Sequence, residues 1–141
     1  MSSFTGNIKL EQIGKTDNCK VLADYSFYSK RFSLKITVKE GFITDLGSIP
    51  TLLQSVVRGS KTRFWRAFVI HDAMYRKGYD RETSDKVLDE ALIVLDCPWW
   101  TRCKIYYPLR VFGSATTDEV LIANASRCVE IEKFEYILAV R

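Results

Sequence analysis

The chain contains a single histidine, His71, which is followed directly by an acidic residue, Asp72. Imidazole has an ordinary pKa that lets it take or give a proton near neutral pH, so His71 is the first candidate for general acid–base chemistry. The same residue lies on an apolar helix face with Phe64, Phe68 and Tyr75. A histidine in that position can equally be a hydrogen-bonded core residue, and both interpretations stay open.

A carboxylate partner for His71 is predicted on the following helix. Apolar spacing predicts one helix from Arg63 to Lys77 and another from Arg81 to Leu95, joined by a short connection into an antiparallel hairpin. At about 1.5 Å per residue, His71 and Asp85 lie at similar depth, about 9 Å and 6 Å from the connection. We expect Asp85 to orient the imidazole within about 2.6–3.2 Å or through one water. The alternative is an exposed acid that complements the helix dipole.

Two further acids are candidates for binding a metal ion. Asp72 points about 100° around the helix from His71, so it is not expected to share the role of Asp85. Carboxylate oxygens suit calcium or magnesium, and Asp45, in the T-D-L-G-S loop, is the second candidate ligand. Asp45 can alternatively organise its loop through an Asx turn. Two acids are too few to specify a metal.

The elements that position these residues are predicted from hydrophobic periodicity. Apolar and polar residues alternate from Arg31 to Lys39, which predicts a half-buried antiparallel strand. The preceding segment, Asn18 to Tyr28, is rich in β-formers, so the two segments predict a hairpin that turns near Ser29. A second alternation, from Cys128 to Val140, predicts a C-terminal strand that closes the sheet or reaches a partner.

A third helix is expected to begin at Asp96 or Cys97. It carries Trp99, Trp100 and two tyrosines, and Pro108 is expected to kink or end it. The predicted fold class is therefore α+β, with an N-terminal antiparallel sheet packed on the helical hairpin and the third helix.

Composition excludes some classes of protein. The 141 residues are 47% hydrophobic and predict a single soluble domain over residues 1–141. No apolar run reaches the roughly 20 residues of a membrane span, and the N-terminus lacks the apolar region of a signal peptide. The net charge of +4 fits an anionic partner without selecting one. The four cysteines lack zinc-ligand spacing, so buried reduced thiols are expected, with a disulfide as the alternative.

Four motifs resemble a phage and prophage family, catalogued as domain of unknown function 1353. They are G-F-I-T-D-L-G-S-I-P at Gly41, H-D-A-M-Y-R-K-G at His71, S-D-K-V-L-D-E-A-L at Ser84 and W-W-T-R-C-K-I-Y-Y-P-L-R-V-F-G at Trp99. The resemblance covers about residues 31–113 and leaves residues 114–141 as an elaboration. It implies a phage origin but no settled activity.

The helical hairpin is also similar, more weakly, to the His-Asp phospholipases, which share His-Asp-x-x-Tyr on one helix and an Asp on the next. That similarity implies that His71 activates water, Asp72 binds calcium, Asp85 orients His71 and Tyr75 braces the network. Two features differ from the secreted enzymes: Val69 and Ile70 replace cysteines, and the loop before the helices is not their glycine-rich calcium loop.

Two hypotheses of function follow. The first is a tail or baseplate component of a phage particle, which binds other phage structural proteins and resides in the virion or, before assembly, in the host cytoplasm. The second is a small metal-assisted hydrolase, with calcium or magnesium as its ion, that acts on envelope phospholipid or peptidoglycan during entry. Nucleic acid is not an expected partner. A buried His71 would favour the first hypothesis and an open cleft at His71 the second.

Overall fold

The computed structural model describes residues 1–14, 18–44, 61–112 and 118–134. Its strands are β1 (Ser3–Thr5), β2 (Leu10–Gln12), β3 (Cys19–Val21), β4 (Tyr25–Ser29), β5 (Leu34–Val38), β6 (Ile43–Thr44) and β7 (Val129–Lys133). Its helices are α2 (Lys61–Arg76), α3 (Arg81–Val94), α4 (Trp99–Phe112) and α5 (Glu119–Cys128). This is the predicted α+β class.

The larger sheet is antiparallel and has the order β1-β4-β5-β7. Its centre is a hairpin, in which β4 pairs with β5 from Tyr25 opposite Val38 to Ser29 opposite Leu34. The predicted first arm, Asn18 to Tyr28, is corrected: it forms two strands, β3 and β4, and β3 pairs in a different sheet. Leu34, Ile36 and Val38 are buried as the alternation predicts, because residues two apart share one face of a strand. A second, three-stranded sheet of order β2-β3-β6, which the sequence did not predict, lies beside the larger one.

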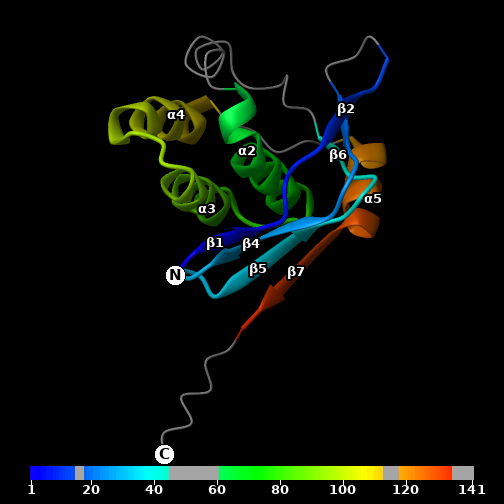
Figure 1. Cartoon of the computed structure of the whole chain (residues 1–141), viewed down its shortest axis with the longest axis horizontal. Helices are drawn as coiled ribbons and strands as arrows, with labels where there is room; N and C mark the ends of the chain where they lie inside the picture. Colours follow the sequence, from blue (N-terminus) through cyan, green and yellow to red (C-terminus); the bar gives the residue numbers. More distant parts are fainter. Residues whose placement is uncertain (15–17, 45–60, 113–117, 135–141) are drawn as a thin grey trace, which may run out of the picture.

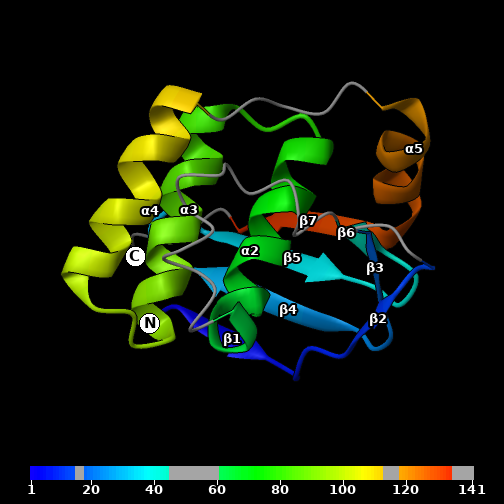
Figure 2. The same ribbon diagram turned by 90° about the horizontal axis from the view of Figure 1, so that it is seen from above.

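The helices α2 and α3 lie side by side over one face of the larger sheet, and α4 lies outside α3 (Figures 1 and 2). The core between these layers includes Phe27 and Ile36 from the sheet and Ile70, Met74 and Leu88 from the helices. Because α4 packs mainly on α3 and not on the sheet, much of its surface faces outward.

The helical hairpin is confirmed. Gly78 follows α2 with a φ of +89°, a conformation that side chains with a Cβ rarely adopt, so the chain can reverse there. Asp80 then caps α3, because its side chain accepts a hydrogen bond from the backbone N–H of Thr83 at 2.9 Å. These two signals bring the chemistry-bearing faces of α2 and α3 together.

Of the two effects expected of Pro108, a kink or an end of the helix, the second does not occur, because α4 continues to Phe112. Proline removes one backbone hydrogen bond, and contacts beyond it hold the last turn. Leu109 is buried, and the guanidinium of Arg81 donates to the carbonyls of Leu109 and Arg110 at 3.0 and 3.1 Å. The last four carbonyls of an α-helix generally have no partner within it, and Arg81 supplies donors to two of them from α3.

The C-terminal strand is confirmed as part of the sheet, because β7 pairs with β5 from Val38–Val129 to Leu34–Lys133. The rest of the predicted strand, residues 135–140, lies outside the described residues. The helix α5, at the far end of the sheet from α4, was not predicted. Its Asn124 accepts a hydrogen bond from Ile43 N–H at 2.8 Å and donates to the carbonyl of Gly41 at 3.0 Å.

None of the four cysteines forms a disulfide in the structure, in agreement with the expected reduced thiols. The expectation that all are buried is only partly met: Cys97 is buried, whereas the side chains of Cys19, Cys103 and Cys128 are partly exposed. None of the helices in the described ranges has the length and apolarity to cross a membrane.

Candidate functional site

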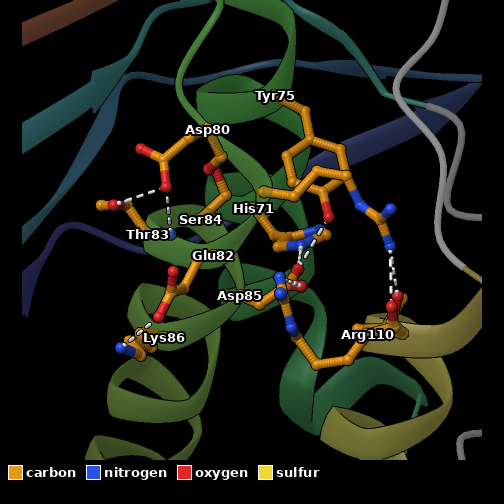
Figure 3. Close-up of polar contacts among 11 residues, drawn as sticks. His71, Tyr75, Asp80, Glu82, Thr83, Ser84, Asp85, Lys86 and Arg110 are labelled. Carbon is orange, nitrogen blue, oxygen red and sulfur yellow. Dashed lines mark hydrogen bonds and ion pairs between the residues drawn. The ribbon is translucent and has the colours of Figure 1, made fainter.

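The predicted pairing of His71 and Asp85 is confirmed. Nε2 of His71, in α2, lies 2.7 Å from Oδ1 of Asp85, in α3, and the two side chains point toward each other across the helical hairpin (Figure 3). Asp85 is completely buried, which rules out the alternative of an exposed first-turn acid. A buried carboxylate needs partners, and the pairing supplies the first of them.

Two more side chains donate to Asp85. The hydroxyl of Tyr75, one turn after His71, donates to the same oxygen, Oδ1, at 2.7 Å. Arg110 reaches from α4 and donates to Oδ2 at 3.1 Å (Figure 3). Asp85 therefore joins three helices through an imidazole, a phenol and a guanidinium. We call these four residues the Asp85 network.

The network keeps Asp85 ionised. Burial acts to raise the pKa of Asp85, but the hydrogen bonds from His71, Tyr75 and Arg110 outweigh it, so the pKa lies below its ordinary value. Burial and the bond to Asp85 raise the pKa of Tyr75 to about 12, and the bond to Asp85 raises the pKa of Arg110. A carboxylate, a neutral phenol and a charged guanidinium are thus the states at neutral pH.

The bond to Asp85 determines which nitrogen of His71 can accept a proton. Because ionised Asp85 can only accept, Nε2 carries the proton that it donates, and a neutral ring then has its lone pair on Nδ1. Nδ1 is therefore the atom that would take a proton from water. Access to it is limited: only 6% of His71 is exposed, and the Tyr75 ring centroid lies 4.2 Å from that of the imidazole.

Asp72 lies apart from the Asp85 network, as its helical position predicts. Its Oδ2 accepts a hydrogen bond from the hydroxyl of Thr44, in β6, at 2.6 Å and lies 3.9 Å from the guanidinium of Arg76. That positive charge opposes the binding of a second cation by the same oxygen.

Metal binding at this place stays a prediction, because the other proposed ligand, Asp45, lies outside the described residues. Within the ranges that are described, no three side chains of His, Cys, Asp or Glu come together as a metal site. The side chains around Asp72 that can be described therefore do not form a calcium or magnesium site by themselves.

The sequence analysis assigned no role to Arg110 or Arg76, although both lie within the quoted motifs. In the structure Arg110 donates to Asp85, and Arg76 lies beside Asp72. Arg76 is buried, donates to the carbonyl of Ile43 and lies over the Phe42 ring at 5.3 Å, so it joins α2 to β6. An arginine near the end of a helix is most often an exposed charge that complements the helix dipole, so neither residue was distinguished by the sequence. A buried carboxylate at Asp85 needs a cationic partner, and this requirement could have prompted a search for an arginine. The sequence spacing did not show which arginine reaches Asp85.

A second feature of functional interest is the outer surface of α4. Three aromatic side chains are largely exposed there: Trp99 is 71% exposed, Trp100 61% and Tyr107 63%, and Val111 lies one turn further on. We call these four residues the α4 aromatic face. Trp, Tyr and Arg are the residues that dominate binding energy at protein interfaces, whereas most monomeric surfaces expose few of them together.

Comparison with known proteins gives one match. The sequence model of a family described as "Protein of unknown function (DUF1353)" matches residues 19–109, so the similarity begins at β3 and ends in α4. The matched part contains α2 and α3 with His71, Tyr75 and Asp85, whereas Arg110, the fourth member of the Asp85 network, directly follows its last residue. No curated protein and no solved structure matches the chain.

Proposed function

The chain belongs to this family of proteins of unknown function (DUF1353), and we propose that it is a component of a bacteriophage particle, in the tail or baseplate, that binds neighbouring particle proteins through the α4 aromatic face. The observation that carries the proposal is the exposure of Trp99, Trp100 and Tyr107 on a helix that packs mainly on α3. Large exposed aromatic side chains on one helix are costly in water and favour a partner.

Two further observations support a binding role. His71, the single histidine of the sequence, is nearly covered, and its partner Asp85 is completely buried. This burial is typical of a network that holds three helices together. The motifs at Gly41, His71, Ser84 and Trp99 resemble those of phage and prophage proteins. On this proposal the protein resides in the virion and, before assembly, in the host cytoplasm.

The test is the location of the protein and its dependence on α4. Density-purified particles of the phage or induced prophage that encodes the chain should contain the protein, as measured by mass spectrometry. The double variant Trp100→Glu/Tyr107→Glu should fold normally by circular dichroism and be lost from the particles. The matched control is Val120→Glu, an exposed apolar residue on α5, which should still be incorporated. Absence of the wild-type protein from purified particles would refute the proposal.

A second candidate function is favoured by one specific observation. The 2.7 Å bond from His71 Nε2 to Asp85 leaves Nδ1 as the basic atom, which is the arrangement of a histidine that activates water. We propose hydrolysis of phospholipid or peptidoglycan as the alternative activity, with His71 as the base, Asp85 as its orienting residue and Tyr75 bracing both. Asp72, with Asp45, would hold calcium or magnesium.

The alternative has its own experiment. Purified protein is incubated with phospholipid vesicles and with peptidoglycan, in calcium, in magnesium and in chelator. His71→Asn should abolish cleavage while Asp89→Asn, a carboxylate of α3 outside the Asp85 network, should retain it. If wild-type protein releases neither fatty acid nor muropeptide under any of these conditions, the hydrolase reading is wrong and the Asp85 network is structural.

A further inference from the structure

A pocket of about 260 Å³ lies between α3 and α4, close to the α4 aromatic face. None of its lining residues belongs to the Asp85 network. Its wall combines aromatic rings with cations: Trp99, Tyr106 and Tyr107 from α4, Arg102 from α4, Lys86 from α3 and Arg31 from the β4–β5 turn. Rings and cations in one concavity suit a ligand that has an apolar body and a negative charge.

The ion pairs around the pocket show how much positive charge is available. Lys86 binds Glu82 at 2.8 Å, so much of its charge is already balanced. Arg102 contacts both oxygens of Asp89 through Nη1 alone, at 3.1 Å each, and among the described residues Nη2 has no hydrogen-bond partner.

Arg31 is the least neutralised of the three cations. Its guanidinium lies 5.4 Å from the centroid of the Phe32 ring, and it makes no ion pair with any carboxylate in the described ranges. Arg31 and the free Nη2 of Arg102 therefore offer donors for about one carboxylate.

The aromatic wall and the volume define the rest of the ligand. Trp99 and Tyr107 are mostly exposed at the pocket, so an apolar or aromatic group placed against them would remove both from water. The volume of 260 Å³ lies just below the range of pockets that enclose drug-sized ligands, about 300–1,000 Å³. It suits one or two protein side chains.

We infer that this pocket receives an acidic segment of a neighbouring protein, in which an Asp or Glu carboxylate binds Arg31 and Arg102 and an adjacent apolar or aromatic side chain packs on Trp99 and Tyr107. The inference deepens the proposed function and rests on it, since it assumes that α4 faces a partner. A nucleic acid fits less well. Asp89 lines the same pocket and Glu82 holds Lys86, so a chain of phosphates would meet two carboxylates.

The test uses the purified full-length protein and a displayed library of random heptapeptides. Peptides enriched on the wild-type protein should carry Asp or Glu within two positions of an aromatic or aliphatic residue. The tightest one, synthesised and measured by quenching of tryptophan fluorescence, should bind about tenfold more weakly to Arg31→Glu and to Tyr107→Ala. Arg127→Glu is the matched control, because Arg127 is an exposed cation of α5 that lines neither the pocket nor the α4 aromatic face.

Several results would overturn the inference. They are the absence of any enriched peptide, enrichment of peptides without acidic residues, equal binding to Arg31→Glu and wild type, or tighter Arg31-dependent binding of decathymidylate than of any peptide. Because this assay needs no particle, its failure leaves the location of the protein in the virion untouched. Absence from the virion, in turn, refutes the proposed function whatever the peptides do.

Discussion

His71 Nε2 and Asp85 Oδ1 lie 2.7 Å apart at a point where two helices and the end of a third meet, and Asp85 exposes none of its side chain. A carboxylate in such a place is stable only while its donors stay in position. The contact therefore stabilises the packing of the three helices whether or not His71 is catalytic, because Tyr75 and Arg110 donate hydrogen bonds to the same carboxylate.

The first prediction is that Asp85→Ala strongly destabilises the protein. The change leaves the donors of His71, Tyr75 and Arg110 without their acceptor, and removal of one partner from a buried charged pair costs about 3–5 kcal/mol. The free energy of unfolding is measured by urea denaturation at neutral pH. Glu82→Gln is the control on the same helix: it disrupts the exposed Glu82–Lys86 pair and should change little. A loss below about 1 kcal/mol for Asp85→Ala would contradict this stabilising role.

The second prediction concerns acid. The pKa of an aspartate in an unfolded chain is about 3.9. The pKa of Asp85 in the folded protein lies below that ordinary value. Ionised Asp85 therefore contributes stability above about pH 4, and that contribution is lost as the pH falls through the folded-state pKa. Urea denaturation of the wild type should show a steeper loss of stability from pH 5 downward than that of Asp85→Asn, which has no carboxyl to titrate. If the stability of the two proteins changes with pH in parallel, the pKa of Asp85 is not lowered in the folded state.

The elements that carry the Asp85 network were predictable because local signals agree with the tertiary structure. The alternation at Leu34, Ile36 and Val38 is that of a half-buried strand, and the structure buries all three. Gly78, which follows α2, and the cap of α3 at Asp80 set the hairpin, and with it the depth at which His71 meets Asp85. A pairing between adjacent helices needs only the helical rise and a short connection.

Features that depend on distant residues could not be predicted in this way. Continuation of α4 past Pro108 depends on Arg81, twenty-seven residues earlier, which binds the carbonyls of the last turn. The second sheet uses strands of two or three residues, which are too short to show a period. Arg110 gave no signal because a lysine or arginine near the end of a helix is most often an exposed charge that complements the helix dipole.

The third prediction concerns Arg76, whose side chain is buried between α2 and β6. Arg76→Met should keep the apolar stem over Phe42 but lose the hydrogen bond to the carbonyl of Ile43 and the charge near Asp72. Loss of a charged hydrogen bond costs about 1.5–3 kcal/mol, and urea denaturation should show a decrease of that size. Lys77→Met, at the exposed position directly after α2, is the control and should leave stability nearly unchanged. Equal stability of the two variants would mean that Arg76 is not required for the α2–β6 contact.

The last prediction is that α5 and β7 are integral to the fold, although they follow the part that the family match covers. The side-chain amide of Asn124 binds backbone around β6 through both its oxygen, which accepts, and its nitrogen, which donates. The strand β7 covers one edge of β5 along its whole length. Asn124→Ala leaves the N–H of Ile43 and the carbonyl of Gly41 without partners, which should cost about 1–3 kcal/mol.

Urea denaturation measures the effect of Asn124→Ala, with Val120→Ala on the exposed face of α5 as the control. Deletion of residues 118–141 should have a larger effect, because it exposes the unpaired edge of β5 and uncovers Ile36 and Val38 at once. We expect that protein to aggregate or to lose the dispersed amide spectrum of a folded domain. A truncated protein that stays monomeric and as stable as the full chain would show that the last two elements are accessory.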